Sequence, residues 1–345
     1  MVLKDIKSMS LPELKSDFEA LSEPSYRASQ VYSWLSKGVY SFDDMTNLPG
    51  TFREVLKSKY YITKLNIKDK KVSIDGTVKY LFELSDGELI ESVLMNYKHG
   101  YSMCLSTQAG CKMGCSFCST GKCGFSRNLS SSEILAQIES AQLDSGIKIS
   151  NIVLMGMGEP LDNYPNVLKF LKLVTSPDGL NIGARHISLS TCGLVDKIYK
   201  LAEEKMPITL SVSLHAPNDE IRNKIMKINR KWNIKELIKA CEDYISYTNR
   251  RISFEYAMID NLNDTPECAN ELAELLKGML CHVNLIPLNG AHQESRLKKS
   301  SNNRIYQFKQ VLEKRGITTT IRRTLGEDIE ASCGQLKNKY LKTSE

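Results

Sequence analysis

From about residue 103 onward, stretches with the pattern of β-strands alternate with stretches that have the pattern of α-helices. This alternation predicts parallel strands joined by crossover helices, because parallel neighbours need a long connection that packs against the sheet. The chain should therefore form an α/β fold with a largely parallel sheet. The candidate strands are 103–105, 149–155, 186–190, 208–214, 252–258, 282–286 and 318–321, and the candidate helices include 131–143, 164–173, 234–247, 266–277 and 303–314.

The positions of small and polar residues favour a partial or complete α/β barrel over a doubly wound open sheet. Glu159 follows one candidate strand, Ser190 ends the next, and His215 follows a third. Barrel enzymes build their sites at this end of the strands, where the loops meet. Sequence pattern alone does not count the strands of such a barrel.

The part of the chain before the α/β pattern is expected to be helical first and then to form hairpins. Helices are predicted from Ser10, over 26–36 and over 51–59, with a short turn at 43–48. Alternating segments follow at 67–74, 78–84 and 89–97, separated by Asp-Gly pairs that are typical of hairpin turns. We predict a helical accessory domain with a hairpin linker at 1–96, the α/β core at 97–327 and a C-terminal segment at 328–345.

Composition restricts the location of the protein. Ten cysteines in a chain without a secretory signal indicate a reducing cytosol, where thiols serve metals and catalysis. No apolar run approaches the ~18 residues of a membrane span. The formal charge of +6 is a mild basic excess that is consistent with a polyanionic partner. We expect a cytoplasmic monomer that does not bind membranes.

Three cysteines lie close together in a loop that also contains small residues. Cys111, Cys115 and Cys118 have the spacing C-x3-C-x2-C. A four-iron cluster is normally held by four thiolates, so a loop that supplies three would leave one iron open to a ligand. The spacing therefore favours an iron-sulfur cluster with a reactive position.

A zinc site is the alternative interpretation of the same cysteines, because Cys104 and Cys123 lie nearby. Structural zinc sites usually pair one C-x2-C unit with a second unit or with histidine. No histidine lies between His99 and His186, which disfavours zinc. A loop without any metal is the third interpretation.

The cysteine motif and three other motifs resemble a known family. The cysteines lie in the run STQAGCKMGCSFCSTG at 106–121, which is followed by GMGEPL at 156–161, SLHAPN at 213–218 and ASCGQL at 331–336. Together they resemble the RlmN type of radical SAM RNA methyltransferase, from about Pro24 to Leu336. The resemblance implies an incomplete barrel of about six strands, a 4Fe-4S cluster on the three cysteines, and S-adenosylmethionine (SAM) at the open iron.

The resemblance also implies how SAM is bound. Gly158 and Glu159 would bind the methionyl amino group, while other polar groups at strand ends would bind the ribose and the carboxylate. Taken singly, each of these residues is as typical of a turn, a strand-end cap or a core histidine, and their common placement is what favours a binding site. The further residues that the resemblance assigns to SAM are Ser190, Ser213, Leu214, His215 and Asn289.

Carbon 2 of adenine is electron-poor and cannot attack a sulfonium methyl group, so a methyltransferase acting there needs radical chemistry. The resemblance implies that Cys333 takes a methyl group from one SAM, and that a second SAM is cleaved to a 5′-deoxyadenosyl radical. The methylated Cys333 would then be joined to the adenine. Release would require Glu91 as the proton acceptor and Cys104 as the resolving thiol, which forms a transient disulfide with Cys333.

The substrates implied by the resemblance are 23S rRNA and also tRNA, with residues 1–96 helping to hold RNA and a flavodoxin or ferredoxin supplying the electron. Pro160 favours the RlmN type over the related Cfr type, which methylates carbon 8. Cfr-like methylation is therefore the close alternative. A non-catalytic, zinc-dependent RNA-binding module is the alternative from a different functional class.

Overall fold

The computed structural model describes residues 3–98, 100–122, 124–288, 297–329 and 336. Its centre is a ten-stranded sheet with the order β14-β13-β12-β11-β10-β9-β6-β5-β4-β3. All neighbours from β6 to β14 are parallel, which confirms the predicted α/β class. The parallel strands are β6 (Gly100–Cys104), β9 (Ile149–Leu154), β10 (Ile187–Thr191), β11 (Thr209–Ser213), β12 (Ile252–Met258), β13 (Cys281–Pro287) and β14 (Thr319–Ile321).

The order of the parallel strands distinguishes a barrel from a doubly wound sheet. From β9 to β14 each strand lies beside the next one in the chain, without the reversal of order that a doubly wound sheet requires. Among the described strands, β14 and β3 form the two edges and do not pair with each other. The sheet is therefore a partial barrel, and its parallel run has one strand more than the resemblance implies.

The predicted hairpins extend this same sheet. Strands β3 (Asn66–Val72), β4 (Val78–Glu83) and β5 (Leu89–Tyr97) are antiparallel, and β5 pairs with β6. The two hairpin turns contain Gly76 and Gly87, whose φ angles of 81° and 85° are favourable for glycine. Backbone pairing thus runs continuously across residue 96, and the division into domains proposed there stays a prediction.

The two faces of the sheet differ in polarity because side chains alternate along each strand. Leu189, Leu210 and Phe254 belong to the main hydrophobic core, together with apolar residues of the helices. Along the other face, Ser190 is paired with Ser211, and Ser213 is paired with Glu255. We call this second face the inner face.

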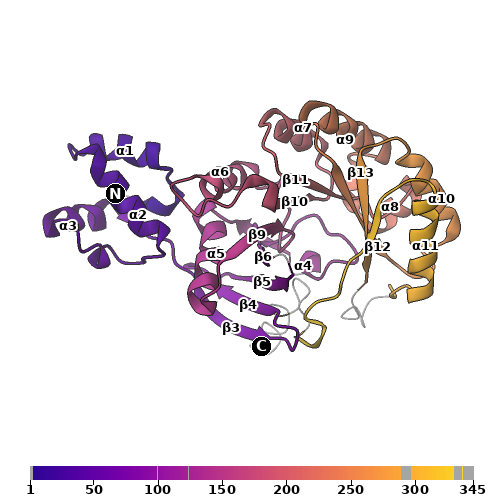
Figure 1. Cartoon of the computed structure of the whole chain (residues 1–345), viewed down its shortest axis with the longest axis horizontal. Helices are drawn as coiled ribbons and strands as arrows, with labels where there is room; N and C mark the ends of the chain where they lie inside the picture. The colour runs from indigo at the N-terminus through magenta and orange to yellow at the C-terminus, as the bar shows by residue number, and fades with distance from the viewer. Residues whose placement is uncertain (1–2, 99, 123, 289–296, 330–335, 337–345) are drawn as a thin grey trace.

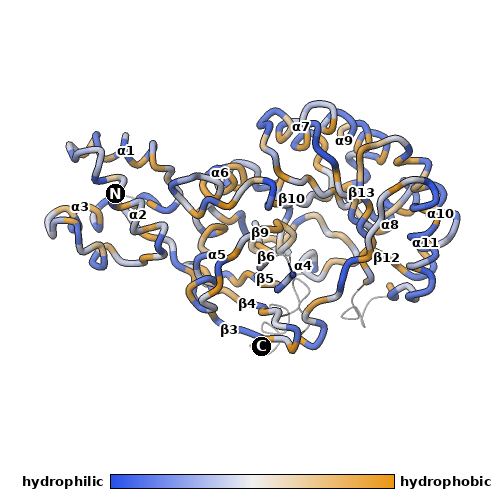
Figure 2. Tube along the Cα trace, viewed as in Figure 1, coloured by the Kyte–Doolittle hydropathy of each residue, from blue (hydrophilic) through white to orange (hydrophobic). Residues whose placement is uncertain are grey.

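Helices cover the apolar face and lie along the outside of the sheet in Figure 1. Hydrophobic and hydrophilic stretches alternate along them in Figure 2, as expected for helices with one buried side. The predicted helices are confirmed to within a few residues at each end. They are α5 (Ser131–Ser145), α6 (Tyr164–Thr175), α9 (Ile234–Thr248), α10 (Pro266–Leu275) and α11 (Asn302–Lys314), to which the structure adds α7 (Val195–Glu203) and α8 (Asp219–Ile225).

The N-terminal helices α1 (Leu11–Glu19), α2 (Ser25–Ser36) and α3 (Gly50–Lys59) form a separate bundle with its own hydrophobic core. Its first helix begins with the predicted cap, since Ser10 accepts a hydrogen bond from the Glu13 amide and the Glu13 carboxylate accepts one from the Ser10 amide. A short parallel pair of β1 (Lys4–Asp5) and β2 (Tyr60–Tyr61) closes the unit. No described helix has the length and apolar character needed to cross a membrane.

Candidate active site

The three-cysteine loop leaves the sheet at the end of β6. It lies between the short antiparallel strands β7 (Gln108–Gly110) and β8 (Phe125–Asn128), with the short helix α4 (Ser119–Lys122) before β8. A side chain at Gly110 would place its Cβ 2.1 Å from the carbonyl oxygen of Gly124, so only glycine fits where the two strands meet. The amide of Cys111 donates to the same oxygen at 2.8 Å, which fixes the start of the loop.

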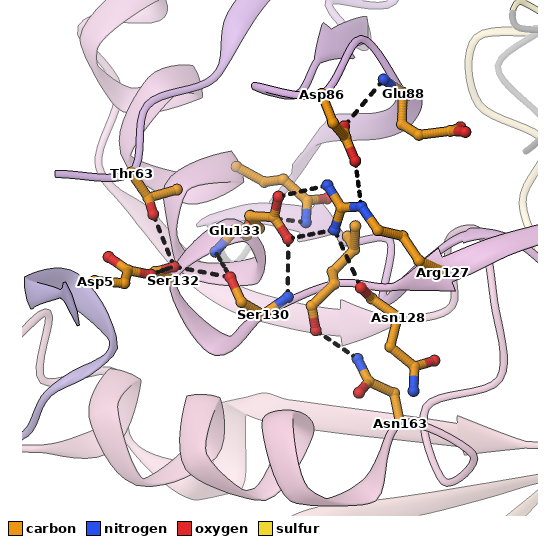
Figure 3. A network of polar contacts seen from close by, with 12 residues as sticks. Asp5, Thr63, Asp86, Glu88, Arg127, Asn128, Ser130, Ser132, Glu133 and Asn163 are labelled. Carbon is orange, nitrogen blue, oxygen red and sulfur yellow. Dashed lines mark hydrogen bonds and ion pairs between the residues drawn. The ribbon is translucent and has the colours of Figure 1, made fainter. Parts of the chain in front are cut away.

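A polar network secures the far end of this loop to the rest of the protein (Figure 3). Arg127 of β8 donates two hydrogen bonds to the Glu133 carboxylate, at 2.9 and 2.8 Å, and also pairs with Asp86 in the β4–β5 turn. Glu133 belongs to the capping box that begins α5. Ser132 in the first turn of α5 contacts Asp5 and Thr63 of the N-terminal unit. One arginine thus connects the loop, the hairpins and α5.

The loop and the carboxyl ends of the strands enclose a cavity of about 310 Å³. Its wall combines sulfur atoms, backbone at glycines and polar side chains from four neighbouring strands and their loops. This is the end of the strands at which a barrel site is expected. The cavity brings together these residues singled out from the sequence: Cys111, Cys115, Cys118, Gly158, Glu159, Ser190, Ser213 and His215.

The loop after β9 passes very close to the chain that leaves β6. At Gly158, which has a φ of 104°, an added Cβ would lie 2.6 Å from the Cβ of Gln108. The side chain of Gln108 accepts a hydrogen bond from the Glu159 amide at 2.8 Å. The glycine thus permits an approach that positions Glu159 on the cavity wall.

The Glu159 carboxylate is buried and accepts hydrogen bonds from the amides of Leu161 (3.0 Å) and Cys192 (2.7 Å). Burial raises the pKa of this carboxyl above its usual value, while the hydrogen bonds act in the opposite direction. Glu159 therefore connects the loop after β9 to the end of β10, and it also presents an acceptor at the cavity.

His215 lies in the left-handed region, with a φ of 57°, directly after β11. Its Nδ1 accepts a hydrogen bond from the Ala257 amide at 2.9 Å, so the proton of the neutral ring is on Nε2. Burial, assisted by the charge of Arg222, lowers the pKa of His215 to about 3. Its ring also meets Phe117 of the cysteine loop edge to face, at 4.7 Å between centroids. The cavity wall thus contains a neutral imidazole whose Nε2–H is able to donate a hydrogen bond.

The loop offers three thiols as ligands for a metal centre at the cavity. Burial raises the pKa of Cys111 and of Cys115 to about 12, so a cationic centre is needed to hold these sulfurs as thiolates. Within the described residues, no three histidine, cysteine, aspartate or glutamate side chains converge where one metal ion could be held. A cluster does not require such convergence, because each cysteine ligates a different iron. The three thiols of the loop can therefore serve as ligands of such a cluster.

The other five predicted residues, including Glu91, either do not line the cavity or lie outside the described residues. Leu214 is fully buried, and its carbonyl oxygen accepts a hydrogen bond from Arg222 at 3.0 Å. Cys104 packs in a cluster with Val93 and Met95. Asn289 and Cys333 lie outside the described residues.

Glu91 lies on the inner face of β5, where only 1% of it is exposed, and its carboxylate is 3.0 Å from the ammonium group of Lys79. Cys104 is the register partner of Val93, two residues after Glu91, so Glu91 and Cys104 share this face. The small apolar cluster of Cys104 also includes Met155, which lines the cavity. The two regions are thus adjacent.

The C-terminal segment is attached to this same part of the sheet. Leu336 packs against Leu81 and Leu89 on the inner face, and Leu81 is the register partner of Glu91. Earlier in the segment, Asp328 accepts a hydrogen bond from the Ile74 amide at 3.1 Å. Described residues on both sides of Cys333 therefore contact the hairpin strands or their turns.

The structure also places residues at the cavity that were not predicted from the sequence. Glu255 is buried in β12 and accepts a hydrogen bond from Asn284 at 2.8 Å, and burial raises its pKa. Cys192 is buried and also lines the cavity wall. The one available signal for Glu255 was its alternation with apolar residues in a strand, which indicates a face but not a site.

The sequence of this chain is similar to two family models and to known proteins. Residues 105–276 match the model of the radical SAM superfamily, and residues 4–62 match that of the ribosomal RNA large subunit methyltransferase N-terminal domain. A probable dual-specificity RNA methyltransferase RlmN from Clostridium novyi is 52% identical, over 99% of this chain and 100% of the relative. The corresponding protein of Clostridium tetani is 53% identical, over 99% and 97%.

A solved structure is also similar throughout. The crystal structure of a radical SAM methyltransferase from Sphaerobacter thermophilus has a TM-score of 0.91 and 43% sequence identity, and the match covers 96% of this chain and 98% of that chain. The likeness therefore includes the N-terminal bundle, the hairpins and the partial barrel together.

Proposed function

Because this chain belongs to the RlmN family within the radical SAM superfamily, we propose that it methylates carbon 2 of adenosine in 23S rRNA and also in tRNA. Membership of the superfamily implies a 4Fe-4S cluster and SAM. The observation that carries the proposal is the cavity in which three cysteines lie beside Gly158, Glu159, Ser190, Ser213 and His215.

The cavity wall has complementary groups for both cofactors. Cys111, Cys115 and Cys118 would ligate three irons, and Glu159 would accept hydrogen bonds from the methionyl amino group. Ser190, Ser213 and the Nε2–H of His215 would bind the ribose and carboxylate, with Leu214 and Asn289 nearby in the chain. When bound, the cluster and SAM supply a carbon radical, with two SAM molecules consumed per turnover.

The inner face of β5 and β6 would carry the second half of the chemistry. Cys333 takes a methyl group as a thiolate and becomes joined through it to the adenine carbon. The adduct gives up its unpaired electron to a one-electron acceptor, and Glu91 accepts the proton that the adenine carbon loses. The Cys104 thiolate attacks the sulfur of Cys333, so that an S–S bond forms as the C–S bond breaks and the freed carbon is protonated. Cytosolic thiols reduce the disulfide and restore both cysteines.

Three structural features support this assignment. Glu91 and Cys104 lie on one face of adjacent strands, Met155 connects their region to the cavity, and Leu336 brings the C-terminal segment to the same face. The described residues contain no disulfide, so the disulfide between Cys104 and Cys333 belongs entirely to the proposal.

The proposal extends to partners and location. The N-terminal bundle, which matches a ribosomal RNA methyltransferase domain, would contact RNA. An external donor such as flavodoxin or ferredoxin would supply the electron to a monomeric enzyme. An RNA substrate of this kind places the reaction in the cytoplasm.

The proposal is tested by anaerobic reconstitution of the whole chain, followed by incubation with methyl-labelled SAM, a reductant, and either 23S rRNA or tRNA. Nucleoside analysis should detect 2-methyladenosine in both RNAs and 5′-deoxyadenosine in solution. Labelled 8-methyladenosine alone would contradict C2 methylation and support the Cfr-like alternative. Stoichiometric zinc without iron in the reconstituted protein would reject the radical mechanism. Label in rRNA only would restrict the substrate to rRNA.

A further inference from the structure

Arg222, on α8, is a fully buried cation with no buried carboxylate as its partner among the described residues. Its exposed fraction is 0%. The guanidinium donates to the carbonyl oxygens of Leu214 (3.0 Å), Cys192 (2.7 Å) and Ser213 (3.1 Å), and to the side-chain oxygen of Asn229 (2.9 Å). Each of these acceptors is neutral. They accept hydrogen bonds from four of the five N–H groups of Arg222 but carry no charge that would compensate its own.

Asn229 links Arg222 indirectly to a carboxylate. Asn229 receives a hydrogen bond from Arg222 and donates one to Asp219 at 2.8 Å. Asp219 also accepts from the Ile234 amide, and it is only partly buried. Its charge is therefore partly solvated. Moving a cation out of water is costly unless a counter-charge is supplied in the same dry region.

The position of Arg222 indicates where that counter-charge belongs. Two of its carbonyl partners are in Cys192 and Ser213, which line the cavity. At the end of α8, the carbonyl oxygen of Ile225 accepts a hydrogen bond from the amide of Ser116 in the cysteine loop, at 3.0 Å.

Ile225 and Met226 also pack in one apolar cluster with Cys115 and Phe117. The helix that carries the buried cation is thus attached directly to the loop that carries the thiols. The cation therefore lies behind the cavity wall, on the side of the cysteines.

We propose that Arg222 is the buried counter-charge of the cluster and that it raises the reduction potential of this cluster. Thiolate ligands make such a centre anionic, and reduction adds one more negative charge. A fixed cation in a region of low dielectric constant stabilises the reduced form more than the oxidised form. Arg222 does not touch the reacting atoms, so it is a positioning and tuning residue rather than a catalytic one. The inference depends on the proposed function, since it requires the cluster.

The inference is tested by redox titration of the anaerobically reconstituted chain, monitored by the electron paramagnetic resonance signal of the reduced cluster. R222Q removes the charge and should lower the equilibrium constant for one-electron reduction at least tenfold, which is a fall of 59 mV. R222K keeps the charge and should retain a potential closer to that of the wild type. Equal falls in R222K and R222Q, or no fall in R222Q, would overturn the inference.

A matched control is available on the same helix. Lys224 is exposed and pairs with Glu220 at 2.9 Å, so K224Q removes one positive charge that water already screens. Its potential should equal that of the wild type. A fall in K224Q as large as that in R222Q would show that burial of the charge is irrelevant and would contradict the inference.

D219N keeps the test decisive even if R222Q does not assemble a cluster. Removing the partly exposed carboxylate leaves Arg222 less compensated, so the potential should rise, and an unchanged or lower potential would overturn the inference. The wild-type sample separates the two proposals. Absence of iron in that sample rejects the proposed function, whereas a loaded, active wild type with an unaltered potential in R222Q rejects the role of Arg222 alone.

Discussion

The cavity half of the protein, with the loops and helices around the cavity, and the hairpin half hold their buried charges in different ways. Beside the cavity, Glu159 and Arg222 are bonded to amides, carbonyl groups and an asparagine side chain. In the hairpin half, Lys79 and Glu91 are both essentially inaccessible to water and lie 3.0 Å from each other. A buried charge that is hydrogen-bonded only to neutral groups still produces a net electrostatic field. In an ion pair, the opposite charge of the partner cancels most of that field.

The two regions are therefore suited to different functions. The cavity half has space of about 310 Å³ and charges that a bound group can complement, as required for holding ionic cofactors. The hairpin half has a buried carboxylate that its lysine partner holds in place before any ligand arrives, which suits the base proposed above.

Loss of one cysteine should abolish the function of the cavity half. In Cys115→Ala we expect no stable four-iron cluster and no detectable methylation, because two thiolates cannot hold it. Iron and sulfide analysis after anaerobic reconstitution checks this result. Cys281→Ser is the matched control, since Cys281 begins β13 outside the cavity, and it should assemble and methylate normally. A loaded and active Cys115→Ala variant would refute the assignment of the loop.

Loss of Cys104 should stop the reaction at its release step, after the radical step at the cavity has joined the protein to the RNA. Cys104→Ala should accumulate a covalent protein–RNA adduct, because no thiol can attack the sulfur of Cys333. Denaturing gel electrophoresis with labelled RNA would reveal the adduct. Cys333→Ala should form neither adduct nor product, and normal methylation in that variant would show that Cys333 carries no methyl group.

Breaking the buried ion pair should cost stability. Lys79→Met leaves the Glu91 carboxylate buried without its ammonium partner, which should lower the free energy of unfolding by about 3–5 kcal/mol. Urea unfolding measures the change. The double variant Lys79→Met/Glu91→Leu should recover most of the loss, because both charges are then absent.

The surface pair of Lys239 and Asp243 provides the comparison for this measurement. Because water already solvates these groups, Lys239→Met should leave the unfolding midpoint almost unchanged. A similar loss in Lys79→Met and Lys239→Met would mean that burial does not distinguish the two pairs.

His215 should make the stability of the cavity half depend on pH. Its pKa is lowered to about 3 when folded, so its contribution is present above the unfolded value of 6.5 and is lost as the pH falls below it. Between pH 6.5 and 5 the wild type should lose roughly 2 kcal/mol more unfolding free energy than His215→Gln. Urea unfolding at both pH values gives the difference, and parallel losses in the two proteins would exclude protonation of His215 as the cause.

Much of the architecture was predictable because its signals are local. The strand over 252–258 coincides with β12, and the capping residues Ser10 and Glu13 begin α1 as expected. The cysteine loop was recognisable because its spacing is contained within eight residues. The helices α7 and α8 were not predicted, and α8 is only seven residues long.

The buried charges were not predictable in the same way. Lys79, Glu255 and Arg222 occur in sequence contexts that are equally typical of exposed positions. The pairing of β4 with β5 places Lys79 beside Glu91, and the packing of α8 under the cavity wall places Arg222 behind the cysteines. Each arrangement joins segments through contacts that local pattern does not encode.

Local pattern was enough to predict most strands and helices, the three thiols and the residues at the strand ends, because periodicity and spacing are properties of neighbouring residues. The tertiary structure decided which polar residues share the inner face, which buried charges are paired and which are left for a ligand. The physical reason is that strand register and helix packing set the distances and the dielectric surroundings on which the energy of a charge depends.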